Sequence, residues 1–168
     1  EEMDNLPPLT YQDGEYIYHR DKGFKLINSQ DFRNYGGLMY GTIWSIGCPL
    51  HCTFCANTKF IEYDNAYRRL RHSKPRTIVD EIKRAIRKKP WISTVQFFDD
   101  SFLNLRYETL EEFCKLYKKE VDIPFFVAGI VPNYVRNDGK VPLLIDAGLN
   151  RLRMGIQSGS ENILEFYK

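Results

Sequence analysis

The sequence lacks long apolar runs, internal repeats and low-complexity tracts. Its 168 residues have a mean hydropathy of −0.45, and no apolar run approaches the ~20 residues that a membrane-spanning helix needs. The opening residues, Glu-Glu-Met-Asp, lack the basic and apolar pattern of a signal peptide. Aromatic residues make up 14% of the chain, which indicates a packed core. We therefore expect a globular, cytoplasmic protein without a membrane segment.

Cysteine is also scarce, with four residues in all, and three of them fall in one short loop. Cys48, Cys52 and Cys55 form a C-x3-C-x2-C pattern, and in a reducing compartment such cysteines bind metal more often than they form disulfides. Three thiolates can hold three irons of a cubane cluster and leave the fourth iron open. A structural zinc site needs four ligands, and His51 lies between two of the cysteines, where geometry opposes joint ligation. Iron–sulfur and zinc readings both remain open at this point.

The net charge is only +2, but residues 68–89 carry ten Lys and Arg against two acidic residues. This basic segment suits an anionic substrate or a nucleic acid. It is more typical, however, of a solvated helix face with a basic loop.

Residues 1–39 show little periodicity and contain Pro7-Pro8, so we predict a linker or lead-in segment there. From residue 40 onward, strand patterns alternate with helix patterns. Strands are expected at residues 42–46, 93–98, 125–131 and 151–157. Helices are expected at residues 78–86, 110–117, 141–147 and 160–167, with Ser73 or Thr77 capping the first and Gly148 ending the third.

Alternating strands and helices predict a parallel sheet with right-handed crossovers. Polar residues follow each predicted strand, at the edge where parallel α/β folds place their sites. In chain order they are Cys48–Cys55, Asp99-Asp100, Asn133 and Gln157-Ser158. The fourth strand would keep an unpaired edge, so we expect the chain to be a fragment of a larger barrel.

The cysteine loop resembles the radical SAM superfamily signature, C-x3-C-x-aromatic-C, in which Phe54 fills the aromatic position. The resemblance implies that residues 40–168 are the first part of a (β/α) TIM-like barrel, truncated after its fourth strand and helix. It also implies a 4Fe–4S cluster on Cys48, Cys52 and Cys55, whose open iron binds S-adenosylmethionine. Reductive cleavage of that cofactor then gives a 5′-deoxyadenosyl radical, which abstracts a substrate hydrogen.

Two further segments resemble the same superfamily. Phe97–Phe102 looks like the motif that binds the methionine ammonium, which implies this role for Asp99 and Asp100. Gly155–Ser160 looks like the segment near the ribose, which gives Gln157 and Ser158 that role, with Gln157 where Glu is commoner. Phe54 would lie near the adenine. The plainer alternatives are that one of the two aspartates caps the following turn and that Phe54 packs in the core.

Weaker patterns resemble the cobalamin-dependent branch: Arg69-Leu70-Arg71 with Ser73 and residues 78–82, and the early segment 3–8. The cobalamin-binding domain itself is not in this sequence. This branch implies methyl transfer or ring formation, with an electron donor such as flavodoxin or ferredoxin and a substrate that the sequence does not name.

Two other functions stay open. One is a methylthiotransferase acting on RNA or protein, which the basic segment would suit but which needs a second cluster. The other is a zinc-stabilised nucleic-acid-binding module. Cys114 lies on the apolar stripe of its predicted helix, and we expect a buried, inert thiol.

Overall fold

The computed structural model describes residues 2–8, 14–135 and 139–167. Its centre is a sheet in which each neighbouring pair of strands is parallel. In sheet order the strands are β3 (Met39–Thr42), β6 (Thr94–Phe97), β7 (Phe125–Ile130) and β8 (Leu149–Met154). The predicted parallel α/β fold is confirmed, and the predicted fourth strand is an edge strand within the part of the chain that is described.

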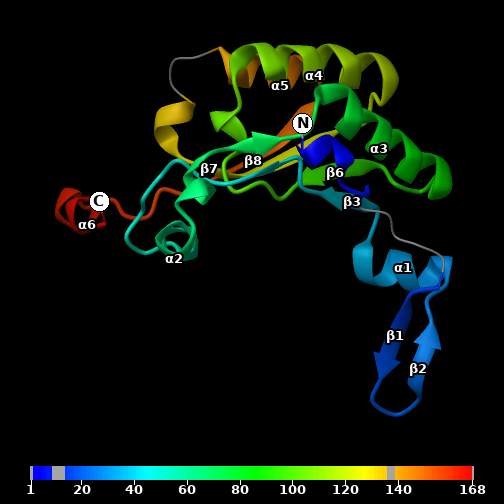
Figure 1. Ribbon diagram of the computed structural model, residues 1–168. Coiled ribbons are helices and arrows are strands. Elements are labelled where there is room, and N and C mark those ends of the chain that lie inside the picture. The colour runs from blue at the N-terminus through cyan, green and yellow to red at the C-terminus, as the bar shows by residue number, and fades with distance from the viewer. Residues whose placement is uncertain (1, 9–13, 136–138, 168) are drawn as a thin grey trace.

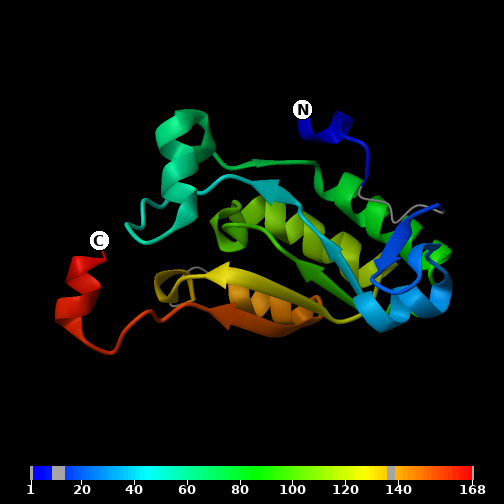
Figure 2. The ribbon, with the colours of Figure 1, turned by 90° about the horizontal axis from the view of Figure 1, so that it is seen from below.

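Three helices cover one face of this sheet (Figure 1). They are α3 (Pro75–Lys88), α4 (Tyr107–Glu120) and α5 (Lys140–Asp146), each close to its predicted position. Gly148, at φ +114°, ends α5 as expected, because a residue with a side chain rarely adopts that conformation. Seen from below, the strands lie in front of these helices (Figure 2). None of the described helices is long and apolar enough to cross a membrane.

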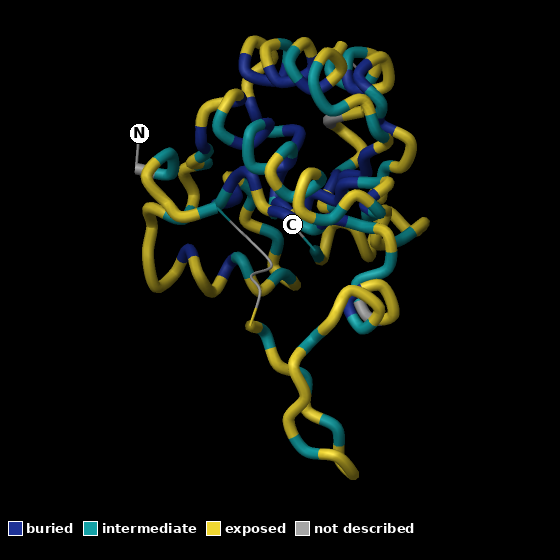
Figure 3. The backbone as a smooth tube through the Cα atoms, turned by 90° about the vertical axis from the view of Figure 1, so that its right-hand side faces the viewer, coloured by how far each residue is buried: buried dark blue, intermediate teal, exposed yellow. Residues whose placement is uncertain are grey.

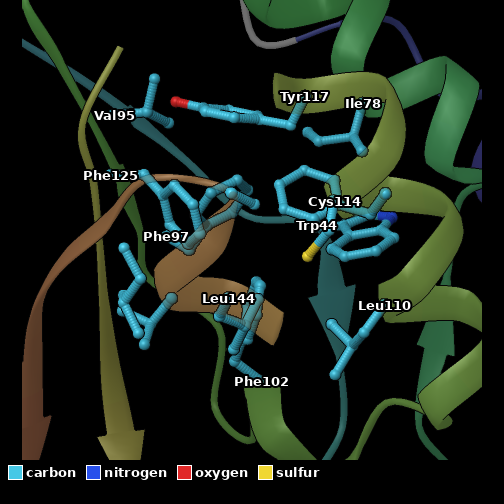
Figure 4. Close-up of a cluster of buried hydrophobic side chains, with 14 of the residues drawn as sticks. Trp44, Ile78, Val95, Phe97, Phe102, Leu110, Cys114, Tyr117, Phe125 and Leu144 are labelled. Carbon is cyan, nitrogen blue, oxygen red and sulfur yellow. The ribbon is translucent and has the colours of Figure 1, made fainter. Parts of the chain in front are cut away.

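Aromatic side chains fill the core between the sheet and the helices (Figure 4). The rings of Phe97, Phe113 and Phe125 pack edge to face, with centroids 5.6–5.9 Å apart, and Tyr117 lies 5.0 Å from Phe125. All four side chains are fully buried. Burying a side chain of this size contributes roughly 1.5–3 kcal/mol, so this cluster fixes the strands and hence the positions of the loops at their carboxyl ends.

The strand predicted at residues 42–46 is divided in the structure. After β3 the chain leaves the main sheet, and β4 (Ser45–Ile46) pairs antiparallel with β5 (Arg71–His72). The reason is Trp44, which lies between β3 and β4 in the chain and is fully buried. Its indole N–H donates to the carbonyl of Ser73 at 2.9 Å. The buried indole therefore interrupts the strand just before the cysteine loop.

Short helices follow the carboxyl ends of the strands. They are α2 (Ala56–Tyr63), η2 (Asn65–Arg68), η3 (Phe102–Asn104), η4 (Pro132–Tyr134) and α6 (Glu161–Phe166). The strand predicted to run to residue 157 ends at Met154, and the next residues have no regular structure.

The prediction that residues 1–39 are irregular is wrong for most of the described part. They form η1 (Glu2–Asn5), a hairpin of β1 (Tyr16–His19) and β2 (Gly23–Leu26), and α1 (Ser29–Gly36). The hairpin projects from the body and is largely exposed (Figure 3). It buries little apolar surface, so its residues do not show the alternation by which strands are recognised in a sequence.

Helix α3 is not capped by the residues that the sequence indicated. Its N-cap is Lys74 and Pro75 occupies the first turn. Neither Ser73 nor Thr77 caps it. Instead, the carboxylate of Asp4, 70 residues away, accepts hydrogen bonds from the Lys74 N–H at 2.8 Å and the Thr77 hydroxyl at 2.6 Å. A cap from such a distant residue leaves no local sequence signal.

Candidate functional site

The three cysteines of the predicted site lie in the loop between β4 and α2. Cys48 is buried, whereas Cys52 and Cys55 are half-buried, and all three are free thiols. Cys55 is the N-cap residue of α2, and its N–H donates to the carbonyl of Cys52 at 3.0 Å. The hydroxyl of Thr58 donates to the same carbonyl at 2.7 Å. These bonds fix the backbone between the second and third cysteines.

Gly47 brings the start of this loop against the segment that follows η2. A Cβ at Gly47 would lie 2.6 Å from the carbonyl oxygen of Arg69 and 2.8 Å from that of Tyr67, and the residue has φ +110°. The next N–H, of Cys48, donates to the Tyr67 carbonyl at 3.0 Å. Only glycine allows this close approach, so the residue before the first cysteine is dictated by packing.

The donor set fits an iron–sulfur cluster better than a single metal ion. Burial raises the pKa of the Cys52 thiol, and the thiols of Cys48 and Cys55 raise it further. In a cubane each thiolate binds its own iron, so three thiols suit a cluster with one open iron. A structural zinc site needs four ligands on one ion, and this loop offers three thiols.

Asp99, predicted to bind the cofactor, directs its carboxylate into the protein. One oxygen accepts from the Ser45 N–H at 2.6 Å and the Ser45 hydroxyl at 2.5 Å, and the other accepts from the Trp44 N–H at 3.1 Å. The residue is 3% exposed, and this burial raises its pKa to about 6 although the three donors lower it. Its carboxylate holds the turn between β3 and β4, so only its backbone carbonyl remains for a ligand.

Asp100 connects the end of β6 with the two helices that follow the cysteine loop, α2 and η2. Its carboxylate accepts from the side-chain amide of Asn57, in α2, at 3.1 Å. It also accepts from the hydroxyl of Tyr67, in η2, at 2.5 Å. Burial raises the pKa of the Tyr67 phenol, and the hydrogen bond to the carboxylate raises it further. Neither aspartate caps η3, whose N-cap residue is Ser101, so the predicted capping alternative is wrong.

Gly129 in β7 lies close to the backbone carbonyls of Asp99 and Asp100, which follow β6. A Cβ there would lie 3.0 Å from the Asp99 oxygen and 3.1 Å from the Asp100 oxygen, and the residue has φ +70°. The register of β7 and β8 is irregular in the same stretch. The close approach brings the two carbonyls beside the next strand, where they form a pair of acceptors.

The segment predicted near the ribose leaves the sheet directly after β8. Gly155 remains tied to β7, because its N–H donates to the Ile130 carbonyl at 2.9 Å. Gln157 is exposed and has φ +65°, unusual for a residue with a side chain. Ser158 is half-buried, and its hydroxyl accepts from the Ser160 N–H at 3.0 Å. Backbone strain of this kind is commonest in binding segments.

Phe54 does not pack in the core, and 48% of it is exposed. Its ring lies edge to face with that of Tyr167, with centroids 5.0 Å apart. Tyr167 directly follows α6, so this contact joins the cysteine loop to the segment after β8. Helices α2 and α6 accordingly lie at the same end of the sheet (Figures 1 and 2).

The structure thus joins the predicted residues in two groups. Asp100 is bonded to the helices that follow the cysteine loop, and Phe54 contacts the segment that follows Gln157 and Ser158. Asn133, the predicted polar residue after the third strand, is exposed in η4. The sequence analysis missed Asn57, Tyr67, Gly47 and Gly129. Only Gly47 carried a signal, because a glycine directly precedes the first cysteine.

Ion pairs account for part of the basic segment at residues 68–89. Arg76 and Lys83 both pair with Glu120 of α4, at 2.8 and 2.5 Å, and Lys74 lies 3.9 Å from Asp4. These contacts favour the interpretation of a charged helix face that packs against α4 and the N-terminal segment.

Comparisons with known proteins agree with the cysteine pattern. The family model of the radical SAM superfamily matches residues 42–168. The chain is 25% identical over 164 residues to cytidylyl-2-hydroxyethylphosphonate methyltransferase of Streptomyces wedmorensis, which covers 98% of this chain and 28% of that protein. It is 27% identical over 118 residues to the anaerobic magnesium-protoporphyrin IX monomethyl ester cyclase of Rubrivivax gelatinosus, covering 68% and 20%.

A third similar protein is the bacteriochlorophyllide d C-8(2)-methyltransferase of Chlorobaculum tepidum, 28% identical over 130 residues, covering 72% of this chain and 26% of that protein. Among solved structures, the cobalamin-dependent S-adenosylmethionine radical enzyme OxsB, with aqua-cobalamin and S-adenosylmethionine bound, matches with a TM-score of 0.63 and 16% identity. That match covers 90% of this chain and 25% of OxsB, and it shows a shared fold. The chain spans 20–28% of the length of these proteins.

Proposed function

Because the chain belongs to the radical SAM superfamily, we propose that it is the part of a radical SAM enzyme that holds the 4Fe–4S cluster on Cys48, Cys52 and Cys55. The observation that carries the proposal is the loop itself: three free thiols between β4 and α2, with a backbone fixed by hydrogen bonds. When bound, the reduced cluster supplies one electron to S-adenosylmethionine, which yields methionine and a 5′-deoxyadenosyl radical.

The chain's own residues position the loop and provide polar groups for the cofactor. Asp100 holds α2 through Asn57 and η2 through Tyr67, and the Tyr67 carbonyl accepts from the Cys48 N–H, so the thiols keep their place relative to the end of β6. The backbone carbonyls of Asp99 and Asp100, brought beside Gly129, are acceptors of the kind that the methionine ammonium needs. Carboxylates and strand-end carbonyls are both suitable acceptors for an ammonium, and for Asp99 we propose the carbonyl, because its carboxylate is engaged by Trp44 and Ser45.

The nucleoside half of S-adenosylmethionine is assigned to the second group of residues. Gln157 and Ser158 offer an amide and a hydroxyl after β8, and both can bond ribose hydroxyls. Phe54 is an exposed ring at the end of the cysteine loop and can cover the adenine. Its contact with Tyr167 keeps the two segments within reach of one cofactor molecule.

For the overall reaction we propose methyl transfer or ring formation that depends on cobalamin. Support comes from the similar proteins, which are two methyltransferases and a cyclase, and from the similar solved structure of a cobalamin-dependent enzyme. Cobalamin would be held by a domain outside this sequence, and the electron would come from a donor such as flavodoxin or ferredoxin.

A methylthiotransferase needs a second set of cluster cysteines. Cys114, the remaining cysteine here, is buried in α4, and burial raises its pKa to about 12.

Iron and sulfide content after anaerobic reconstitution tests the ligand assignment. Replacing any one of the loop cysteines with Ala should abolish or strongly reduce cluster incorporation, because a two-cysteine loop leaves two irons without protein ligands. Cys114→Ala is the matched control and should bind as much iron as the unmodified protein. Equal iron content in Cys48→Ala and Cys114→Ala would refute the assignment.

A further inference from the structure

The face of the sheet opposite α3, α4 and α5 carries a row of side chains that the cluster and S-adenosylmethionine do not use. The strand registers place Gly41, Gln96, Phe126 and Arg151 side by side across β3, β6, β7 and β8. This face is turned toward the viewer in Figure 2, and no described helix packs over it there. Phe126 and Gln96 are 7% and 9% exposed.

A bulge in β8 directs two arginines onto this face. Phe125 pairs with Leu149 but Phe126 pairs with Arg151, so β8 has one extra residue at this point. Leu149 packs in the core on the helix side, and Arg151 lies on the other side. Two residues further on, Arg153 occupies the same side, because side chains alternate along a strand. A strand without the bulge would put Leu149 and Arg151 on one face.

Both guanidinium groups lie over one aromatic ring. The Arg151 carbon Cζ is 5.8 Å from the centroid of Phe126, and that of Arg153 is 5.6 Å away. Contacts of this length orient a guanidinium without neutralising it. Among the described residues, no carboxylate forms an ion pair with either arginine, whereas Arg76 of the basic segment has two acidic partners. Two adjacent, exposed and unneutralised guanidinium groups produce a locally positive surface.

The position of this surface relative to the proposed cofactor site fits a substrate. Arg153 precedes Gln157 by four residues, so the two are at most about 13 Å apart along the chain. The surface is therefore next to the carboxyl edge of the sheet, where the radical would form, yet deeper along the strands than the residues assigned to S-adenosylmethionine.

We propose that Arg151 and Arg153, on the platform of Phe126 and with the amide of Gln96, bind an oxyanion of the substrate, a carboxylate or a phosphoryl group. The fork of a guanidinium matches both groups, and the aromatic ring beneath limits its freedom. This inference rests on the proposed function, since it takes the carboxyl edge as the place of the radical. It predicts that the enzyme acts on an acidic organic molecule and holds it by its anionic end.

Arginine labelling in the full-length protein tests the site without turnover. Phenylglyoxal modifies accessible arginines, and mass spectrometry would follow Arg151 and Arg153, with exposed Arg87 of α3 as the internal control. Inorganic phosphate and acetate are the probes, each compared with chloride at equal ionic strength. We expect one or both probes to slow the labelling of Arg151 and Arg153 and to leave the labelling of Arg87 unchanged. The probe that protects the two arginines more strongly tells whether the site prefers phosphoryl or carboxylate groups. Equal protection of all three arginines would mean salt screening, with the two arginines merely protecting an edge strand, and would overturn the proposal.

Variants separate a substrate site from a cofactor site. In Arg151→Gln and Arg153→Gln, binding of the protecting probe should weaken about tenfold or more, because a charge-assisted hydrogen bond is lost. Arg87→Gln should bind it normally, and all three should bind S-adenosylmethionine equally well. Weaker S-adenosylmethionine binding in the two β8 variants would assign these arginines to the carboxylate of the cofactor and overturn the substrate role. The labelling requires no cluster, so absence of a cluster would count against the proposed function and not against this site.

Discussion

Replacing Gly47 with alanine should damage the cysteine loop more than a glycine replacement ordinarily damages a turn. The residue precedes Cys48 and has φ +110°. An alanine Cβ would lie 2.6 and 2.8 Å from two backbone oxygens, of Arg69 and Tyr67, neither of which can rotate away as a side chain would. Cys48 must then move away from the segment to which its N–H is bonded.

Two terms add to the expected cost. A residue with a side chain in the left-handed region costs about 1–2 kcal/mol. Forcing a methyl group against packed backbone costs typically 1–3 kcal/mol more. The sum of about 2–5 kcal/mol is a large part of the 5–15 kcal/mol that stabilises an ordinary domain.

Urea denaturation followed by tryptophan fluorescence measures this loss, because Trp44 is buried next to the loop. Gly14→Ala is the matched control: Gly14 has φ +108° but nothing within 4 Å of the added Cβ, so only the first term applies. The Gly47 variant should exceed the control by about 1–3 kcal/mol and should also incorporate less iron. Equal costs for the two variants would refute the close packing of the loop on residues 67–69.

Three further predictions concern the surroundings of the site. Burial raises the pKa of Asp99 from 3.8 to about 6, so the folded state favours its protonated form. The free energy of unfolding, measured relative to Asp99→Asn, should be highest below pH 4 and should fall by up to roughly 3 kcal/mol as pH rises through 6. A difference that grows over this range in denaturation of the apo-protein would contradict the prediction. Lys83 and Arg76 of α3 lower the pKa of Glu120, so at pH values above the usual pKa of a glutamate this carboxylate stabilises the contact between α3 and α4. Glu120→Gln should therefore lower the melting temperature in low salt more than Glu111→Gln, and the difference should shrink in 1 M salt. Phe54→Ala should speed hydrogen exchange in α6, because Tyr167, the residue that follows this helix, loses its ring contact, whereas Phe60→Ala should not; equal exchange in both would argue against that contact.

The core of the fold was predictable because its signals are local. Strands β6 and β7 are rich in β-branched and aromatic residues and are followed by polar residues, and α3 and α4 show apolar residues at helical spacing. The family was predictable for the same reason, since the spacing of the three cysteines is a local pattern. The hairpin before α1 was missed because it buries little, so burial leaves no pattern in its sequence.

What the sequence could not supply are contacts between distant residues. Asp99 and Asp100 are adjacent and look equivalent, yet one carboxylate turns inward to Ser45 and the other reaches Tyr67. Which of the two carboxylates turns inward depends on the pleat of β6 and on the buried indole of Trp44. The alternation of Arg151 and Arg153 with apolar residues likewise predicts only a half-exposed strand. The bulge of β8 against β7 is what puts both arginines on the face without helices.

The central claim is that this loop holds a cluster with an open iron. Its most direct test is electron paramagnetic resonance of the anaerobically reconstituted, dithionite-reduced protein, recorded before and after S-adenosylmethionine is added. The account predicts a reduced 4Fe–4S signal that shifts on addition, because the cofactor binds the iron that lacks a cysteine ligand. A cluster signal indifferent to S-adenosylmethionine would contradict it.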